Sequence, residues 1–273
     1  MNFTSPYAFK DMQKSVERII KAIETQEKIV IWGDFDADGV TSTCLLFKTL
    51  EHLGANVEYY IPSRHKENHG LNSNAIVKFL TKKVKLFITV DCASNDEKEI
   101  SLIKSFNADV IVTDHHDIPA ELPEAEVLLN PKLETSGYPF RELCGAGVAM
   151  KLAVALGAEP TTYLGFAAVA TVCDIVTLLE ENRTIVKLGL QQLHQCSNLG
   201  LNALAEGNQL RLSAINTGDI GYRIGPCINA SGRLASADLA MQLLLAADET
   251  TAMELASELI RLNEERKEKT QSC

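Results

Sequence analysis

Short apolar runs alternate with amphipathic segments in the first half of the chain. Residues 29–32, 57–61, 86–90, 110–113 and 127–129 are rich in β-branched and aromatic side chains and too short for helices, which is typical of buried parallel strands. Residues 11–25, by contrast, place apolar side chains at the spacing of one helix face. The alternation predicts an α/β fold, a parallel sheet of about five strands flanked by helices.

Beyond residue 131 the strand pattern stops and helical spacing dominates. Helices are predicted over residues 145–156, 162–172, 182–194 and 236–247, and from 250 to about 270. The apolar stripe of the last helix ends at Leu262, after which only charged and polar residues follow. We therefore expect an α/β part over 1–131, a mainly helical continuation over 132–248, and the start of a linker helix over 249–273.

Composition limits the class of protein. The 273 residues are 46% hydrophobic with mean hydropathy near zero, enough for a sizeable core. No apolar run has transmembrane length and no targeting signal begins the chain, so we expect a cytoplasmic protein that does not bind membranes. Seven scattered cysteines without a C-x-x-C pair argue against disulfides and favour a reducing compartment. The net charge of -10 disfavours nucleic-acid binding unless cations neutralise part of it.

Acidic and imidazole side chains follow three of the predicted strands. They are Asp34, Asp36 and Asp38 after the first, Asp91 after the third, and Asp114, His115 and His116 after the fourth. Because the carboxyl ends of parallel strands share one edge, these groups should lie together. Clustered carboxylates either raise their pKa values or bind cations, and carboxylate with imidazole suits transition metals. The pattern predicts a two-metal hydrolytic site, with Asp174 after the apolar run 166–172 as a further ligand.

Each motif taken alone has a simpler interpretation. The D-x-D-x-D stretch could be an ordinary acidic turn, and Asp91 could be a helix cap. An EF-hand is disfavoured, because position 12 counted from Asp34 is Leu45 instead of Glu. Residues 94–97 have the S-x-x-E form of a capping box that would start a helix.

Glycine-containing segments are candidates for anion binding. Residues 145–150 fail the dinucleotide fingerprint but predict a helix start whose amides can face an anion. Residues 225–233 are interpreted as a loop presenting Asn229 and Arg233 to phosphate, the alternative being a structural turn. Arg64, after the second strand, is another phosphate candidate, whereas His69 in the same loop is expected to be solvent-exposed.

These segments, in this order, resemble the DHH phosphoesterase superfamily, named for the triplet at 114–116. Within it the chain is similar to the bacterial exonucleases that degrade single-stranded DNA from 5′ to 3′. The similarity lies in residues 5–12, 33–42, 89–92, 130–132, 138–140, 144–149, 170–174 and 225–233. It covers the catalytic domain and the beginning of a linker helix, and we expect the family's DHHA1 and oligonucleotide-binding domains to be missing from this chain.

The resemblance implies an assignment of the site. Two Mn²⁺ or Mg²⁺ ions would be held by Asp36, Asp38, Asp91, His115 and Asp174, with Asp91 bridging. Asp34 and His116 would complete or support that shell as catalytic residues, and Arg64, Asn229 and Arg233 would hold DNA phosphates. The implied activity is metal-dependent phosphodiester hydrolysis in DNA repair and recombination, with a helicase or single-strand-binding protein as candidate partners.

Two positions depart from the family pattern, and other functions stay open. Ala93 stands where the family usually has Gly, and Cys227 stands where it usually has Arg, which would remove a positive charge from the phosphate segment. The alternatives are a relative that degrades short oligoribonucleotides or cyclic dinucleotides, a non-catalytic DNA-binding or scaffold module with the same fold, and a chain inactive until joined to another polypeptide.

Overall fold

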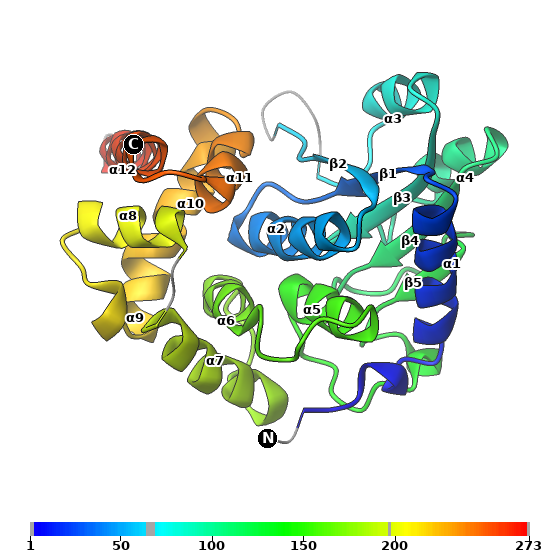
Figure 1. Ribbon diagram of the computed structural model, residues 1–273, viewed down its shortest axis with the longest axis horizontal. Helices are drawn as coiled ribbons and strands as arrows, with labels where there is room; N and C mark the ends of the chain where they lie inside the picture. Colours follow the sequence, from blue (N-terminus) through cyan, green and yellow to red (C-terminus); the bar gives the residue numbers. More distant parts are fainter. Residues whose placement is uncertain (1–2, 64–68, 196–197, 272–273) are drawn as a thin grey trace.

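Five parallel strands form a single sheet in a computed structural model that describes residues 3–63, 69–195 and 198–271 (Figure 1). The strands are β1 (Lys28–Trp32), β2 (Asn56–Tyr60), β3 (Val84–Val90), β4 (Asp109–Thr113) and β5 (Val127–Leu129). Their order is β2-β1-β3-β4-β5, and all neighbouring pairs are parallel. The predicted sheet is confirmed. The chain reverses its direction of travel between β1 and β3, which is where open α/β sheets form a ligand-binding crevice.

Helices cover both faces of the sheet. One face packs against α1 (Met12–Glu24), α2 (Ala37–His52) and α5 (Gly145–Ala155), and the other against α3 (Ser73–Thr81) and α4 (Glu97–Ser105) (Figure 1). In β1, Ile29 and Ile31 belong to the first core, whereas Val30 and Trp32 belong to the second. Because side chains alternate along a strand, burial on both faces requires the continuous apolar runs seen in the sequence.

The second half of the chain is helical, as predicted. Its longer helices are α6 (Leu164–Cys173), α7 (Glu180–Leu193), α8 (Leu199–Gly207), α10 (Gly225–Leu234), α11 (Asp238–Leu245) and α12 (Glu249–Gln271). Shorter pieces are η1 (Pro6–Ala8), η2 (Glu134–Ser136), η3 (Leu212–Ala214), α9 (Thr217–Asp219) and the π-helix η4 (Ile220–Ile224). One apolar core extends from Phe9 to Leu262. The predicted divisions at 131 and 248 stay predictions.

The segment 225–233 is a helix, so the prediction of a loop was wrong. Pro226 occupies the first turn of α10, where its missing N–H has no cost. The glycines serve close packing instead of a turn. A Cβ at Gly225 would collide with Cys173 Sγ, and one at Gly232 would lie 2.5 Å from the carbonyl oxygen of Phe35. Glycine therefore lets α10 approach α6 and the β1–α2 loop.

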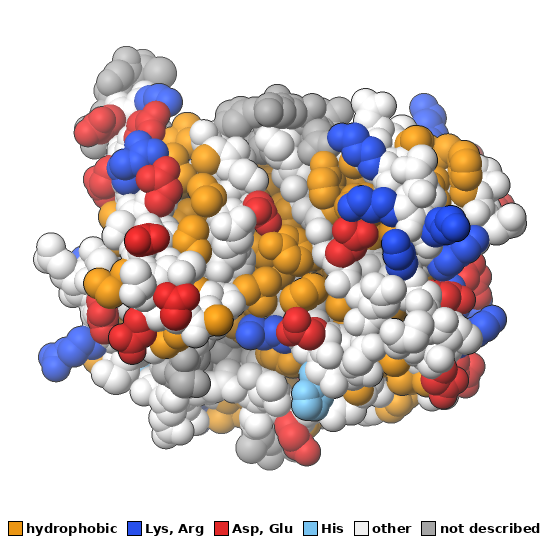
Figure 2. Space-filling view, turned by 45° about the horizontal axis from the view of Figure 1, so that its top comes forward, with side chains coloured by type: hydrophobic (Ala, Val, Ile, Leu, Met, Phe, Trp, Pro, Cys, Tyr) orange, Lys and Arg blue, Asp and Glu red, His pale blue; other side chains and the backbone are white. Residues whose placement is uncertain are grey.

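Charge is distributed unevenly over the surface. On the face drawn in Figure 2, Lys and Arg side chains gather over the half that contains α3 and α4, and Asp and Glu are more frequent over the α8–α12 half. In the described part of the chain, no helix is long and apolar enough to cross a membrane.

Candidate metal centre

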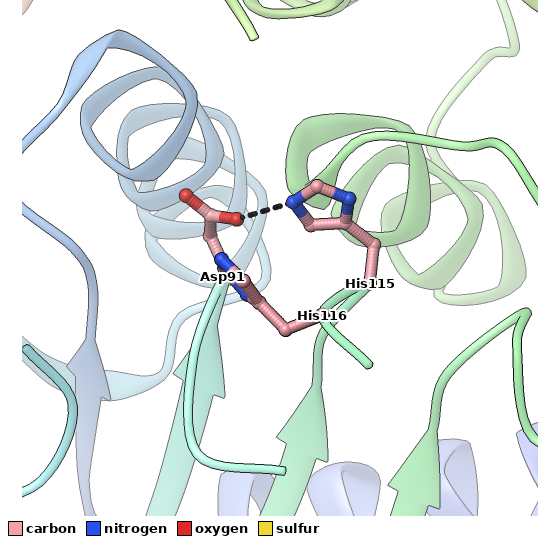
Figure 3. Close-up of side chains that lie close together, drawn as sticks. All are labelled: Asp91, His115 and His116. Carbon is pink, nitrogen blue, oxygen red and sulfur yellow. Dashed lines mark ion pairs between the residues drawn. The ribbon is translucent and has the colours of Figure 1, made fainter. Parts of the chain in front are cut away.

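The predicted ligands converge at the carboxyl-terminal edge of the sheet. Asp34 and Asp36 lie between β1 and α2, Asp38 in the first turn of α2, Asp91 directly after β3, His115 and His116 after β4, and Asp174 at the end of α6. Figure 3 shows Asp91, His115 and His116 above the ends of their strands, with an ion pair joining Asp91 to His115. Sequence-distant residues thus form one cluster.

One imidazole nitrogen faces three carboxylates from three elements. His115 Nε2 lies 3.1 Å from Asp91 Oδ1 and 3.6 Å from both Asp38 Oδ2 and Asp174 Oδ2. Asp38, Asp91 and His115 are buried, and Asp174 is partly exposed. The centre therefore has a buried floor and one side open to solvent.

Candidate ligand atoms form three overlapping groups, each within 4.8 Å. The groups are Asp34, Asp36 and Asp91; Asp38, His115 and Asp174; and Asp91, His115 and His116. Asp91 belongs to two of them, the position that a bridging carboxylate would occupy. Asp34 belongs to one group, and the role that the resemblance implies for it, completing or supporting the ligand shell as a catalytic residue, stays a prediction.

Several of these buried atoms have no hydrogen-bond partner in the described part of the protein. They include Asp34 Oδ1, Asp91 Oδ1 and His115 Nε2. Their close contacts are ion pairs, between His69 Nδ1 and Asp34 Oδ1 at 3.2 Å and between His115 Nε2 and Asp91 Oδ1 at 3.1 Å. Unsatisfied buried polar atoms are rare because each costs free energy, so a cluster of them needs an explanation. Carboxylate oxygens together with imidazole nitrogen are donors suited to Mn²⁺ and, for the all-oxygen group, to Mg²⁺. The residues present fit the pair of divalent cations implied by the sequence.

Burial and mutual repulsion shift the acidity of the cluster. Burial, together with the neighbouring Asp38 charge, raises the pKa of Asp91 well above its ordinary value. Burial also raises the pKa of Asp36 and Asp38, and raises the pKa of Asp174 to about 6. These carboxylates resist ionising together, and divalent cations would remove that repulsion.

The N-terminus of α5 holds Asp38 in place. The amides of Gly145 and Ala146 each donate to a different carboxylate oxygen of Asp38, both at 2.7 Å. A Cβ at Gly145 would lie 2.6 Å from the Cβ of Asp91, so glycine is required for this approach. The prediction that these amides face an anion is confirmed, and the anion is a protein carboxylate.

The first turn of α2 joins the acidic loop to α10. Asp36 Oδ1 accepts a hydrogen bond from the amide of Gly39 at 2.9 Å, which caps the helix. Asn229 Oδ1 accepts from the amide of Ala37 at 2.7 Å, so this predicted phosphate contact also orients the acidic loop. Arg233 is exposed one turn further along α10, and Arg64 lies outside the described residues.

Asp114 supports the cluster from below. Its carboxylate accepts from the amides of Ser94 and His115, and Oδ1 lies 2.7 Å from His116 Nδ1. Burial alone would raise the pKa of Asp114, but the bond and charge of His116 and the bonds from Ser94 hold it well below its ordinary value. Reciprocally, Asp114 raises the pKa of His116 to about 9, so this imidazole is cationic at neutral pH.

The capping box predicted at residues 94–97 is wrong. The N-cap of α4 is Asp96, without a side-chain capping bond. The backbone amide of Ser94 instead donates a hydrogen bond to Asp114, and an Asp96 oxygen accepts one from the amide of Leu71 at 2.7 Å. Tertiary partners offered by two other loops replace the local motif.

His69 is a site residue that the sequence did not reveal. Its Nδ1 lies 3.2 Å from Asp34 Oδ1, and its ring is perpendicular to Phe35 and edge-on to His116, with centroid distances of 6.4 and 5.1 Å. The side chain is 46% exposed, so the expected solvent exposure is confirmed, and the contact with Asp34 comes in addition. No local pattern predicts this contact, since tertiary packing brings the β2–α3 segment over the edge.

Cys227 lies on a different side of α10 from Asn229, the residue predicted to contact phosphate. Its Sγ is buried, 3.6 Å from the Nδ2 atoms of Asn208 and Asn263, toward α8 and α12. Asn229 follows two residues later and therefore points from nearly the opposite side of the helix. The departure from the family pattern changes an internal contact between helices and leaves the face of Asn229 as it was.

The fold and the metal centre together define the class to which this protein belongs. Residues 28–171 match the family model described as the DHH family, N-terminal domain, and the chain is a member of this family.

Within the family the chain is similar to RecJ exonucleases. It is 42% identical over 266 residues to the single-stranded-DNA-specific exonuclease RecJ of Bacillus subtilis, covering 97% of this chain and 34% of the relative. For RecJ of Haemophilus influenzae the identity is 36%, covering 97% and 49%. The chain thus spans about a third to a half of these curated relatives.

Solved structures give the same grouping. A crystal structure of exonuclease RecJ bound to manganese superposes with a TM-score of 0.87 at 35% identity, covering 95% of this chain and 67% of that one. RecJ of Thermus thermophilus in complex with Mn²⁺ superposes with a TM-score of 0.84 at 34% identity, covering 95% and 38%.

Proposed function

We propose that this chain is a metal-dependent phosphodiesterase that removes nucleotides from single-stranded DNA in the 5′ to 3′ direction, in DNA repair and recombination. The observation that carries the proposal is the overlap of the ligand groups at Asp91 and His115, whose buried atoms lack other hydrogen-bond partners among the described residues. The names of the RecJ relatives support the substrate and the nuclease activity.

The residues divide the work of the reaction. We assign Asp34, Asp36 and Asp91 to one cation and Asp38, His115 and Asp174 to the other, with Asp91 bridging. When bound there, Mn²⁺ or Mg²⁺ would supply a hydroxide nucleophile and charge stabilisation of the leaving oxygen. Asp114 keeps His116 protonated, so that its Nε2 can donate a proton to the phosphate or to the leaving 3′ oxygen.

DNA is held beside the cations in this proposal. Asn229, whose side chain contacts the N-terminus of α2, and Arg233 both lie on α10, and we assign them to the phosphate backbone. Arg64, which lies outside the described residues, is a further proposed phosphate contact. A helicase or single-strand-binding protein remains a proposed partner. We also propose a cytoplasmic location, supported by the free cysteines among the described residues.

The test is incubation of the purified chain with Mn²⁺ and labelled single-stranded DNA, duplex DNA, short RNA and a cyclic dinucleotide, with Asp91→Asn as the control. Mononucleotides released from 5′-phosphorylated single-stranded DNA alone support the proposal. Turnover of only RNA or cyclic dinucleotides assigns the chain to the other DHH phosphodiesterases. Metal-independent turnover, or none in the wild-type protein, contradicts the proposal.

A further inference from the structure

Two positively charged side chains, Lys132 and Arg141, lie beside the metal centre on the side of β5, opposite α10. The side chain of Asn130, which follows β5, donates to the carbonyl of His116 at 2.9 Å and accepts from the amide of Lys132 at 2.9 Å. Arg141 in turn donates to the carbonyl of Lys132 at 2.9 Å. Hydrogen bonds therefore tie the positions of Lys132 and Arg141 to the DHH triplet.

Lys132 and Arg141 line a hollow of about 470 Å³, which we name the β5-side hollow. Its other lining residues include Asp117, Ile118, Leu122 and Glu134. Asp117 pairs with Lys132 at 3.0 Å, but its side chain is 95% exposed, so an incoming anion can replace it at little cost. The volume lies within the range of small-ligand sites, and the lining combines apolar side chains with two basic and two acidic ones.

An exposed apolar side chain directly follows one of the candidate metal ligands. Ile175 directly follows Asp174 and is 88% exposed, with φ of +58°. A β-branched residue in this backbone region is strained, and an exposed side chain gains nothing from folding. Asn182 Nδ2 donates to the carbonyls of both Thr177 and Glu142, which joins the Ile175 loop to the segment carrying Arg141.

We propose that the β5-side hollow, with Ile175, is a second nucleotide subsite, in which Lys132 and Arg141 bind a backbone phosphate and Ile175 packs against a base. The occupant is the single DNA strand next to the scissile bond, so this inference rests on the proposed function. Continuity with the metal centre favours that occupant, because Asp117 of the hollow directly follows His116 and Asn130 joins Lys132 to the His116 carbonyl. The strand crosses the sheet edge from the α10 side, with Asn229 and Arg233, to the β5 side.

Binding of a fluorescent oligothymidylate to the Asp91→Asn protein with Mn²⁺ tests the phosphate contacts without requiring turnover. In that background, Lys132→Ala/Arg141→Ala should weaken binding about tenfold at low salt and reduce the slope of log K against log salt by about 0.7, the value for one phosphate contact with a single strand. The matched control is Lys28→Ala/Lys78→Ala, which removes the same charge from exposed positions at the start of β1 and on α3. It should leave the affinity and slope close to those of the parent.

The base contact needs a second variant. Ile175→Gly removes the apolar side chain and suits the positive φ, so the variant should fold at least as stably as the parent. It should weaken binding of oligothymidylate about threefold and leave an abasic oligonucleotide of the same length unaffected.

The two proposals fail in different ways. Equal salt slopes in the parent and in the Lys132/Arg141 variant, or equal effects of Ile175→Gly on normal and abasic strands, overturn the subsite. If the salt slope falls in the Lys132/Arg141 variant but the wild-type chain is inactive, the subsite is supported and the proposed hydrolysis is contradicted.

Discussion

Helix α5 joins two buried clusters of charged side chains that differ in whether their polar atoms have hydrogen-bond partners. At its N-terminus the carboxylates of the metal centre crowd around His115, and several of their atoms lack partners among the described residues. Further along, Lys151 contacts Glu181 and donates to the carbonyl of Thr4 at 2.7 Å, while Glu181 also accepts from Tyr138 Oη at 2.5 Å. Glu181 Oε1 accepts in addition from the amide of Thr4.

The difference separates a binding site from a structural tie. The Lys151 cluster satisfies its own charges and fastens the N-terminal segment to α5 and α7. The metal centre gathers more carboxylates than histidines, and burial raises the pKa values of Asp36, Asp38 and Asp91. Buried carboxylates that the protein neutralises only in part indicate that another species completes the neutralisation.

The largest expected effect comes from Asp91→Asn. Asparagine has the same shape and tolerates the positive φ of 61° at this position, so the fold should persist. Loss of the shared ligand should reduce kcat at least about 1,000-fold. Without metal, the same variant should be more stable to urea than the wild type by about 1 kcal/mol, because a buried negative charge is removed. If the Asp91→Asn variant turned over substrate as fast as the wild type, or were less stable than the wild type without metal, the metal-centre assignment would be contradicted.

Breaking the satisfied cluster should act in the opposite sense. Glu181→Ala leaves Lys151 buried without its partner and should lower the free energy of unfolding by about 3–5 kcal/mol, measured by urea denaturation. Below the shifted midpoint, Mn²⁺-dependent turnover should remain. The control is Arg261→Ala, which breaks the exposed Arg261–Glu258 pair on α12 and should change stability little. Similar effects of the two variants would show that the buried tie is not structural.

The pH dependence of stability should also distinguish the clusters. Because the pKa of Asp174 rises from its ordinary 3.8 to about 6 on folding, its contribution is fully present below pH 3.8 and is lost as pH rises through 6. Without metal, the free energy of unfolding of Asp174→Asn should therefore rise relative to that of the wild type between pH 3.8 and pH 6. The rise should be about 1–2 kcal/mol, because the group is partly exposed to screening solvent. With Mn²⁺, the wild type should be more stable than Asp174→Asn above pH 6. A difference that is constant with pH would contradict the shift.

The smallest effect concerns the backbone beneath Asp91. Ala93 has φ of +83°, a conformation that favours the glycine usual in the family, whereas Ala168 lies within α6. Both substitutions to glycine lose a buried methyl group and add the same freedom to the unfolded chain. Ala93→Gly should therefore cost at least about 1 kcal/mol less than Ala168→Gly in urea denaturation. Equal costs would show that Ala93 is not strained.

Features with a local cause were predicted best. The five strands appear within two residues of their predicted bounds, because burial on both faces demands continuous apolar runs. Asp34, Asp36, Asp38, Asp91, His115 and His116 converge because they follow strands of one parallel sheet, whereas Asp174 joins them from the end of α6. The segment 225–233 was misread because its glycines suggest a turn locally, whereas contacts with Cys173 and Phe35 explain them.

The sequence by itself determined the sheet and the ligand types brought to its edge, since both depend on periodicity and on the topology of parallel strands. Only the tertiary structure decided that α5 amides hold Asp38, that His69 reaches Asp34, and that Lys132 and Arg141 line a hollow beside the DHH triplet. These contacts join segments far apart in the chain, and their geometry is set by helix packing that no local pattern encodes.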